Sequence, residues 1–129
     1  MRYIFSLDQV SLPIVGTELR FPVRRIYCIG RNYLEHIRET KDADEREDPF
    51  FFQKPADSVL QQGENFPYPP QSQNVHHEIE LVVAIRTRGK DILIENALDH
   101  VFGYGVGIDM TRRDLQSIAK KMKRPWEAG

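Results

Sequence analysis

Two segments of the chain alternate between residue types in a way that predicts β-strands. Residues 78–85, with the sequence EIELVVAI, are β-branched and apolar through their second half. In residues 102–109 the apolar side chains alternate with glycines and a final aspartate: Phe102, Gly103, Tyr104, Gly105, Val106, Gly107, Ile108 and Asp109. Because successive side chains of a strand point to opposite faces, we expect one face here to be core and the other to be nearly bare backbone.

Shorter patterns predict further elements in the first half of the chain. Residues 1–22 consist of short extended pieces interrupted by proline, and residues 25–29 form a compact strand that ends at Gly30. Residues 31–39 have helical spacing of their apolar positions. The run Phe50–Lys54 predicts a buried strand that leads into a turn.

The last part of the chain predicts an amphipathic helix. Its apolar stripe has the spacing i, i+3, i+4, i+7 and consists of Leu115, Ile118, Ala119 and Met122. We expect Thr111 to cap this helix in a capping-box pattern with Asp114, and Pro125 to end it.

The same helical segment is rich in bases, and this leaves two interpretations. Residues 111–124 contain Arg112, Arg113, Lys120, Lys121, Lys123 and Arg124. A non-catalytic module could use such a helix to bind nucleic acid or a partner surface. We favour a surface helix whose C-terminal bases complement the helix dipole.

Composition narrows the class of protein. The 129 residues hold 18 Lys and Arg against 19 Asp and Glu, a formal charge of −1, which argues against a polyanion as the partner. A single cysteine, Cys28, and the lack of a signal-peptide pattern predict a soluble protein of the reducing cytoplasm. No apolar stretch is long enough to span a bilayer, so a membrane is not an expected partner. The balanced charge means that nucleic acid is not an expected partner either.

The almost wholly charged run 38–48 predicts a solvated loop or a mobile flap.

Two glutamates lie on one face of the predicted strand 78–85. Glu78 and Glu80 point the same way as Val82 and Ala84, so both carboxylates are directed toward an apolar layer. Two like charges are costly to bury without a strong positive partner, and a divalent cation with oxygen ligands would serve. The alternative is an edge strand whose outer face is wet. Asp109 likewise ends either a trough that a ligand approaches or a trough that packs against a second sheet.

Four motifs in order closely resemble the fumarylacetoacetate hydrolase superfamily. They are Gly30–Tyr33 followed by His36 and Glu39, Phe52–Pro55, His76–Leu81, and Asp109–Gln116. Among its members the small acylpyruvate hydrolases are most similar, and the phrase from Pro49 to Pro55 is most like fumarylpyruvate hydrolases. The resemblance covers about residues 22–129.

The resemblance implies an α+β fold that is mostly β, a mixed β-roll or sandwich with short flanking helices, truncated at the C-terminus. Residues 1–22 would be an N-terminal β extension, and residues 23–129 the N-terminal part of the catalytic domain. In the family this domain continues beyond the equivalent of Gly129 and supplies a substrate-binding lysine there. We therefore expect the 129-residue chain to be a part of an enzyme that is inactive alone.

The resemblance also implies the site residues. Glu78, Glu80 and Asp109 would hold Mg²⁺ or Mn²⁺. His36 and Glu39 would form the water-activating dyad: at i and i+3 they share one side of a helix, so Glu39 can orient the imidazole that takes the proton. The implied substrate contacts are Arg31, Tyr33, Lys54, Arg113 and Gln116.

The implied reaction is metal-dependent hydrolysis of a carbon–carbon bond in a 2,4-dioxo acid. Fumarylpyruvate would give fumarate and pyruvate, as in gentisate-type catabolism of aromatic compounds, with pyruvate leaving as its enolate. Oxaloacetate decarboxylation and 2-hydroxy-dienoate isomerisation stay open, because the same carboxylates serve all three through an enolate. The family usually forms homodimers, so a homodimer is expected.

Overall fold

The computed structural model describes residues 3–30, 32–33 and 48–129. The chain divides into two compact units, Met1–Tyr68 with Pro125–Glu127, and Pro69–Arg124 with Ala128–Gly129. Strands predominate over helices in the described part, in agreement with the expected mostly β class. The predicted division into residues 1–22 and 23–129 stays a prediction.

In the first unit, two short strands form an antiparallel pair. Strand β1 (Ser11–Pro13) pairs with β2 (Arg20–Pro22), so the expected extended pieces form a small hairpin-like ladder. Pro13 is the last residue of β1, a position that edge strands tolerate because proline donates no ladder hydrogen bond. Arg20 Nε donates to Ser11 Oγ at 2.8 Å, which adds a side-chain link across the pair.

A second antiparallel pair in this unit joins β3 (Ile26–Gly30) to β4 (Phe50–Lys54). Both strands were predicted, but β4 is not buried along its length, because Phe51 is 63% exposed. A single pair of strands buries one face at most, and here that face holds Phe50 and Phe52. Their rings lie 4.7 and 5.9 Å from the ring of Trp126.

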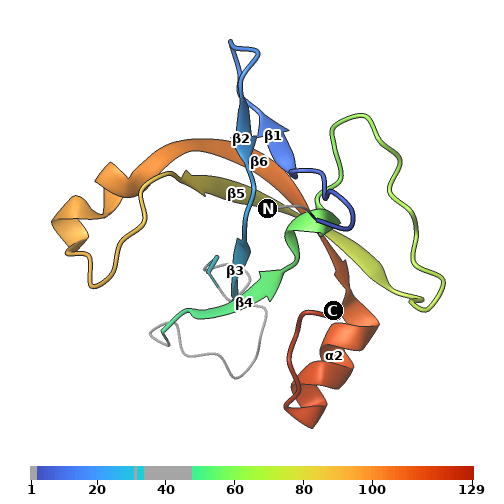
Figure 1. Ribbon diagram of the computed structural model, residues 1–129. Coiled ribbons are helices and arrows are strands. Elements are labelled where there is room, and N and C mark those ends of the chain that lie inside the picture. Colours follow the sequence, from blue (N-terminus) through green and yellow to red (C-terminus); the bar gives the residue numbers. More distant parts are fainter. Residues whose placement is uncertain (1–2, 31, 34–47) are drawn as a thin grey trace. The chain divides into compact units, whose positions relative to one another are not determined.

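The second unit is built on two long antiparallel strands that run side by side along a curved ribbon (Figure 1). Strand β5 (Val75–Ile85) and strand β6 (Val101–Arg112) are joined by a connection that contains a 3₁₀ helix over Ile94–His100. Helix α2 (Arg113–Met122) follows β6 without a loop. The two strands predicted from alternation are therefore real, and each is longer than its pattern indicated.

The two faces of this sheet differ in chemistry. One face carries only apolar side chains over most of its length, and its most exposed members are Ile79, Leu81, Tyr104, Val106 and Ile108. The expectation that this face of β6 is core is wrong for the described chain, since Val106 is 80% exposed. A two-stranded sheet needs another layer to bury an apolar face, and no other described element of the second unit provides that layer.

Helix α2 begins and ends differently from the prediction. Arg112 occupies the N-cap position without a side-chain cap, and Thr111 is a buried residue of β6. The capping box is therefore wrong, because β6 runs three residues further than its pattern, to Arg112, and takes Thr111 into the ladder. At the other end the helix stops before Pro125 is reached: Lys123 adopts the left-handed conformation, with φ 52°.

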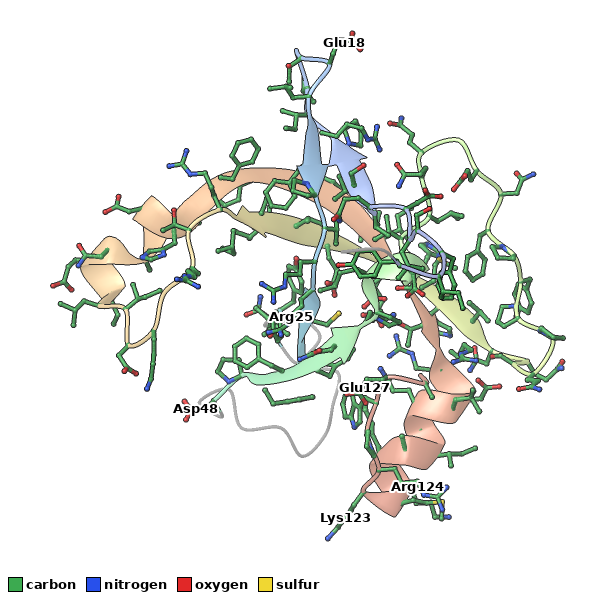
Figure 2. All side chains as sticks on the ribbon, viewed as in Figure 1. Glu18, Arg25, Asp48, Lys123, Arg124 and Glu127 are labelled. Carbon is green, nitrogen blue, oxygen red and sulfur yellow. The ribbon has the colours of Figure 1, made fainter. Side chains whose placement is uncertain are left out.

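The C-terminus of α2 is a Schellman motif with lysine in place of glycine. Lys123 N–H donates to the carbonyl of Lys120 at 3.2 Å, and Arg124 N–H donates to that of Ala119 at 2.9 Å. The side chains of Lys123 and Arg124 project from this end of the helix (Figure 2). None of the helices that the structure describes is both long and apolar enough to cross a membrane.

Candidate metal and substrate site

The register of β5 on β6 brings the predicted carboxylates onto one face of the sheet. Glu78 lies directly opposite Asp109, and Glu80 lies opposite Gly107. Residues that face each other on antiparallel strands have Cβ atoms about 4.5–5.5 Å apart and point to the same side. Because Glu80 follows Glu78 by two positions, it shares that side. All three carboxylate residues are half-buried.

Beside these carboxylates, β6 carries glycines on the same face of the sheet. Gly105 and Gly103 lie opposite Val82 and Ala84, so small residues continue the face away from the acids. A Cβ at Gly103 would meet nothing within 4 Å, whereas a Cβ at Gly107 would come within 2.8 Å of Val82 Cγ2. The glycines of β6 thus share this face with the carboxylates as expected, and Gly107 is the position where a Cβ would collide with Val82.

Helix α2 places a guanidinium against this face. Arg113, the first residue of the helix, forms an ion pair with Glu78 through its Nη2, and its Nη1 donates to Gln116 Oε1 at 2.9 Å. The side chains of Arg113 and Glu78 are 24% and 30% exposed, and Gln116 is buried. Positions 113 and 116 share one side of the helix, so the structure brings both predicted residues to the carboxylate face.

A polar contact that the sequence did not indicate ties α2 to the segment before β5. The Asp114 carboxylate accepts hydrogen bonds from Ser72 Oγ at 2.8 Å and from the Gln73 N–H at 2.9 Å. The bond from the Gln73 N–H, followed by that from Ser72, lowers the pKa of Asp114 below its ordinary value of 3.8. Asp114 thus holds the preceding segment instead of capping its own helix with Thr111. No local pattern could reveal this contact, because its partners are far apart in the sequence.

The structure does not place the remaining predicted site residues relative to this face. Arg31, His36 and Glu39 fall outside the described residues, as does the predicted flap except for its last residue. Tyr33 and Lys54 belong to the first unit, where Lys54 ends β4 and Tyr33 is exposed. Their roles stay predictions.

The donor set suits a hard divalent cation, although the side chains are not gathered around one point. Among the described residues, no three His, Cys, Asp or Glu side chains are grouped so that they could hold a metal ion. One reason is visible in the contacts, since the Glu78 side chain is turned toward Arg113. Carboxylate oxygens are nevertheless the ligands that Mg²⁺ and Mn²⁺ prefer, and these three share one sheet face.

Comparison with known proteins identifies the class. Residues 25–129 match the family model described as fumarylacetoacetate (FAA) hydrolase, C-terminal. The chain belongs to the fumarylacetoacetate hydrolase family, which confirms the resemblance drawn from its four motifs.

A solved relative is similar over almost the whole chain. The crystal structure of fumarylpyruvate hydrolase from Pseudomonas aeruginosa, in complex with Mn²⁺ and pyruvate, is 53% identical. It superimposes with a TM-score of 0.91 over 99% of this chain and 57% of its own chain. The expected fold class and the likeness to fumarylpyruvate hydrolases are confirmed by this match.

Two curated relatives are named for chemistry on oxaloacetate. A mitochondrial oxaloacetate decarboxylase of Dictyostelium discoideum is 45% identical over 104 residues, which are 80% of this chain and 47% of that protein. A mitochondrial oxaloacetate tautomerase of Arabidopsis thaliana is 39% identical over 102 residues, 79% of this chain and 45% of that protein. The chain thus spans about half the length of these relatives. Because both are named as mitochondrial, the cytoplasmic location stays a prediction.

Proposed function

We propose that this chain provides the carboxylate face and substrate-binding helix of an enzyme that hydrolyses a carbon–carbon bond in a 2,4-dioxo acid. The proposed substrate is fumarylpyruvate, and the products are fumarate and pyruvate. The observation that carries the proposal is the register that sets Glu78 opposite Asp109, with Glu80 on the same face and Arg113 against Glu78. The likeness to a fumarylpyruvate hydrolase bound to Mn²⁺ and pyruvate supports it.

Glu78, Glu80 and Asp109 are the residues that would hold Mg²⁺ or Mn²⁺. When bound, the cation would act as a Lewis acid that stabilises the negative charge developing on the departing pyruvate enolate. Each carboxylate has two oxygens, so Glu78 can keep its ion pair with Arg113 through Oε1 and still present Oε2 to a cation.

Arg113 and Gln116 would bind the oxygens of the dioxo acid. Gln116 Oε1 already accepts from Arg113 Nη1, so the amide NH₂ of Gln116 is the group that points to other acceptors. A guanidinium has five N–H donors, which allows Arg113 to hold Glu78 and Gln116 and still donate to a substrate carboxylate. Arg31, Tyr33 and Lys54 are proposed as further substrate contacts.

His36 is proposed to take the proton from the attacking water, with Glu39 orienting its imidazole. This assignment depends on the family motif alone. Glu39→Gln should lower hydrolysis by about 10²-fold or more, because the imidazole would lose the carboxylate that orients it and supports its positive charge. Hydrolysis left intact in that variant would remove the dyad from the proposal.

The second candidate function is chemistry on oxaloacetate. The 45% identity to an oxaloacetate decarboxylase and the 39% identity to an oxaloacetate tautomerase favour it. Oxaloacetate is a smaller 2-oxo acid that also reacts through an enolate, so the same carboxylates and Arg113 would serve.

A substrate screen separates these candidates. The protein, as produced from its own gene, is assayed with fumarylpyruvate, acetylpyruvate and oxaloacetate in the presence of Mg²⁺ or Mn²⁺. Hydrolysis of fumarylpyruvate releases fumarate, decarboxylation of oxaloacetate releases CO₂, and tautomerisation changes only the enol absorbance. We expect the highest kcat/KM with fumarylpyruvate, and its loss in Asp109→Asn but not in the exposed control Asp99→Asn. A higher kcat/KM with oxaloacetate would replace the first candidate by the second.

The proposal includes a homodimer, a cytoplasmic location and a place in aromatic catabolism. The exposed apolar face of the sheet, with Val106 80% and Ile79 69% exposed, supports burial against a further layer in the assembled protein. Light scattering coupled to size-exclusion chromatography would show whether the protein is a dimer.

A further inference from the structure

We propose that Asp114 is a positioning residue for substrate binding: it anchors the start of helix α2 to the segment before β5 and so directs Arg113 onto the carboxylate face. The inference rests on the proposed function, because it assumes that Arg113 binds a substrate oxygen. Asp114 itself would contact neither the substrate nor the metal.

The anchor uses both oxygens of the carboxylate. Oδ1 accepts from Ser72 Oγ at 2.8 Å and from the Leu115 N–H at 2.9 Å, and Oδ2 accepts from the Gln73 N–H at 2.9 Å. Ser72 is 2% exposed, and its Oγ also lies 3.4 Å from the Asn74 N–H. Charge-assisted hydrogen bonds to a carboxylate are the stronger kind, and here they converge from two segments of the chain.

The anchored segment leads directly into the strand that carries the site. Asn74 immediately precedes β5, and its carbonyl accepts from the Arg113 N–H at 2.8 Å. The backbone at Arg113 is therefore held on one side by Asn74 and on the other by the anchored side chain of Asp114. With its backbone held at these two points, the Arg113 side chain reaches Glu78 on β5.

Helix geometry separates the two roles. Consecutive residues of a helix are rotated by about 100°, so Asp114 points away from the side that Arg113 and Gln116 share. The helix also lacks a side-chain N-cap, and the Asp114 carboxylate ties its first turn to Ser72 and Gln73 independently of the Arg113 ion pair with Glu78. A shift of the first turn would move the guanidinium relative to Glu78, and misplacement by about 1 Å can cost about 10²-fold in activity.

The test measures pyruvate binding by calorimetry in Mn²⁺ buffer, together with steady-state kinetics. Asp114→Asn keeps the size of the side chain but loses its charge and one acceptor. We expect it to raise the Kd of pyruvate about 10- to 100-fold, the range seen when a supporting hydrogen bond is removed from a site. KM should rise with it. Asp99→Asn, at an exposed carboxylate in the same unit, is the matched control and should leave both values unchanged.

A double-mutant cycle distinguishes positioning from a merely structural role. If Asp114 acts through Arg113, then in an Arg113→Ala background Asp114→Asn should change the pyruvate Kd by about twofold or less. An equal loss in both backgrounds, or no loss in Asp114→Asn while circular dichroism shows it folded, would overturn the inference. Should Asp114→Asn fail to fold, Ser72→Ala, which spares the Gln73 hydrogen bond, enters the same cycle with the same two outcomes.

The kinetic arm uses whichever of fumarylpyruvate and oxaloacetate the unmodified protein turns over faster. If the proposed hydrolysis is wrong, the unmodified protein alone shows this, because it does not hydrolyse fumarylpyruvate. A failure of the positioning role shows in the ratio of variant to unmodified protein, and the pyruvate titration gives that ratio without any turnover.

Discussion

Glu78 on β5 lies directly opposite Asp109 on β6 in the antiparallel ladder. A slip of one position would set Ile108 or Met110 opposite Glu78 and turn the aspartate to the other face, because side chains alternate with a period of two. The pairing register therefore decides whether these acids can act on one ligand.

Divalent cations should stabilise the protein through this face. Addition of Mn²⁺ at a free concentration 100 times its Kd should raise the free energy of unfolding by about 2.7 kcal/mol, since the cation binds the folded state. Thermal unfolding with Mn²⁺ and with EDTA measures the effect. The stabilisation by Mn²⁺ should be mostly lost in Asp109→Asn and kept in Asp99→Asn. If the unfolding midpoint of the unmodified protein does not change with Mn²⁺, the metal site is contradicted.

Arg113 should not be replaceable by lysine. An ammonium is a compact charge that cannot reach Glu78 and Gln116 in the planar geometry of a guanidinium, so Arg113→Lys should lower kcat/KM about 10- to 100-fold. The exposed Arg124 at the far end of α2 provides the control, and Arg124→Lys should leave kcat/KM unchanged. Equal kinetics in the two variants would show that only the charge of Arg113 matters.

The stability that Asp114 provides should depend on pH. Its pKa is lower in the folded protein than its ordinary value of 3.8, so the contribution is complete above that value. It is lost as the pH falls through 3.8 toward the folded pKa. The difference in urea midpoint between unmodified protein and Asp114→Asn should therefore shrink on acidification, and a difference that grew would reverse the sign of the argument.

Glycine at position 123 should stabilise the end of α2 more than lysine does. Lys123 has φ 52°, a conformation that disfavours a Cβ, so Lys123→Gly should raise the free energy of unfolding by about 1 kcal/mol. Lys121→Gly, two residues earlier in the last helical turn, should lower it by about 1 kcal/mol. Urea titration of both variants tests the pair, and the same sign in both would contradict the strained cap.

Gly30 should be needed to seat the aromatic cluster around Trp126. A Cβ at Gly30 would lie 2.2 Å from the ring of Phe50, which packs edge-on against Trp126. Gly30→Ala should therefore move the Phe50 ring and shift the fluorescence of Trp126, the single tryptophan of the chain. Gly103→Ala, where a Cβ meets nothing within 4 Å, should leave the emission spectrum unchanged.

Local pattern predicted most of the described elements but not their limits. Alternation located β5 and β6, and apolar spacing located α2, because these signals depend on neighbours in the sequence. The predicted cap at Thr111 is wrong, because nothing local shows that β6 continues through Thr111, where it pairs with His76. Alternation predicts which apolar side chains of β6 share a face, whereas their burial depends on the layer that a second segment supplies.

The sequence by itself determined which residues share a side: Glu78 with Glu80, and Arg113 with Gln116. These relations follow from the fixed periods of strand and helix. The tertiary structure decided that Asp109 faces Glu78, that Arg113 reaches Glu78, and that Asp114 holds Ser72 and Gln73. Each of these depends on the pairing of segments far apart in the chain, and a register or hydrogen bond between such segments leaves no local pattern in the sequence.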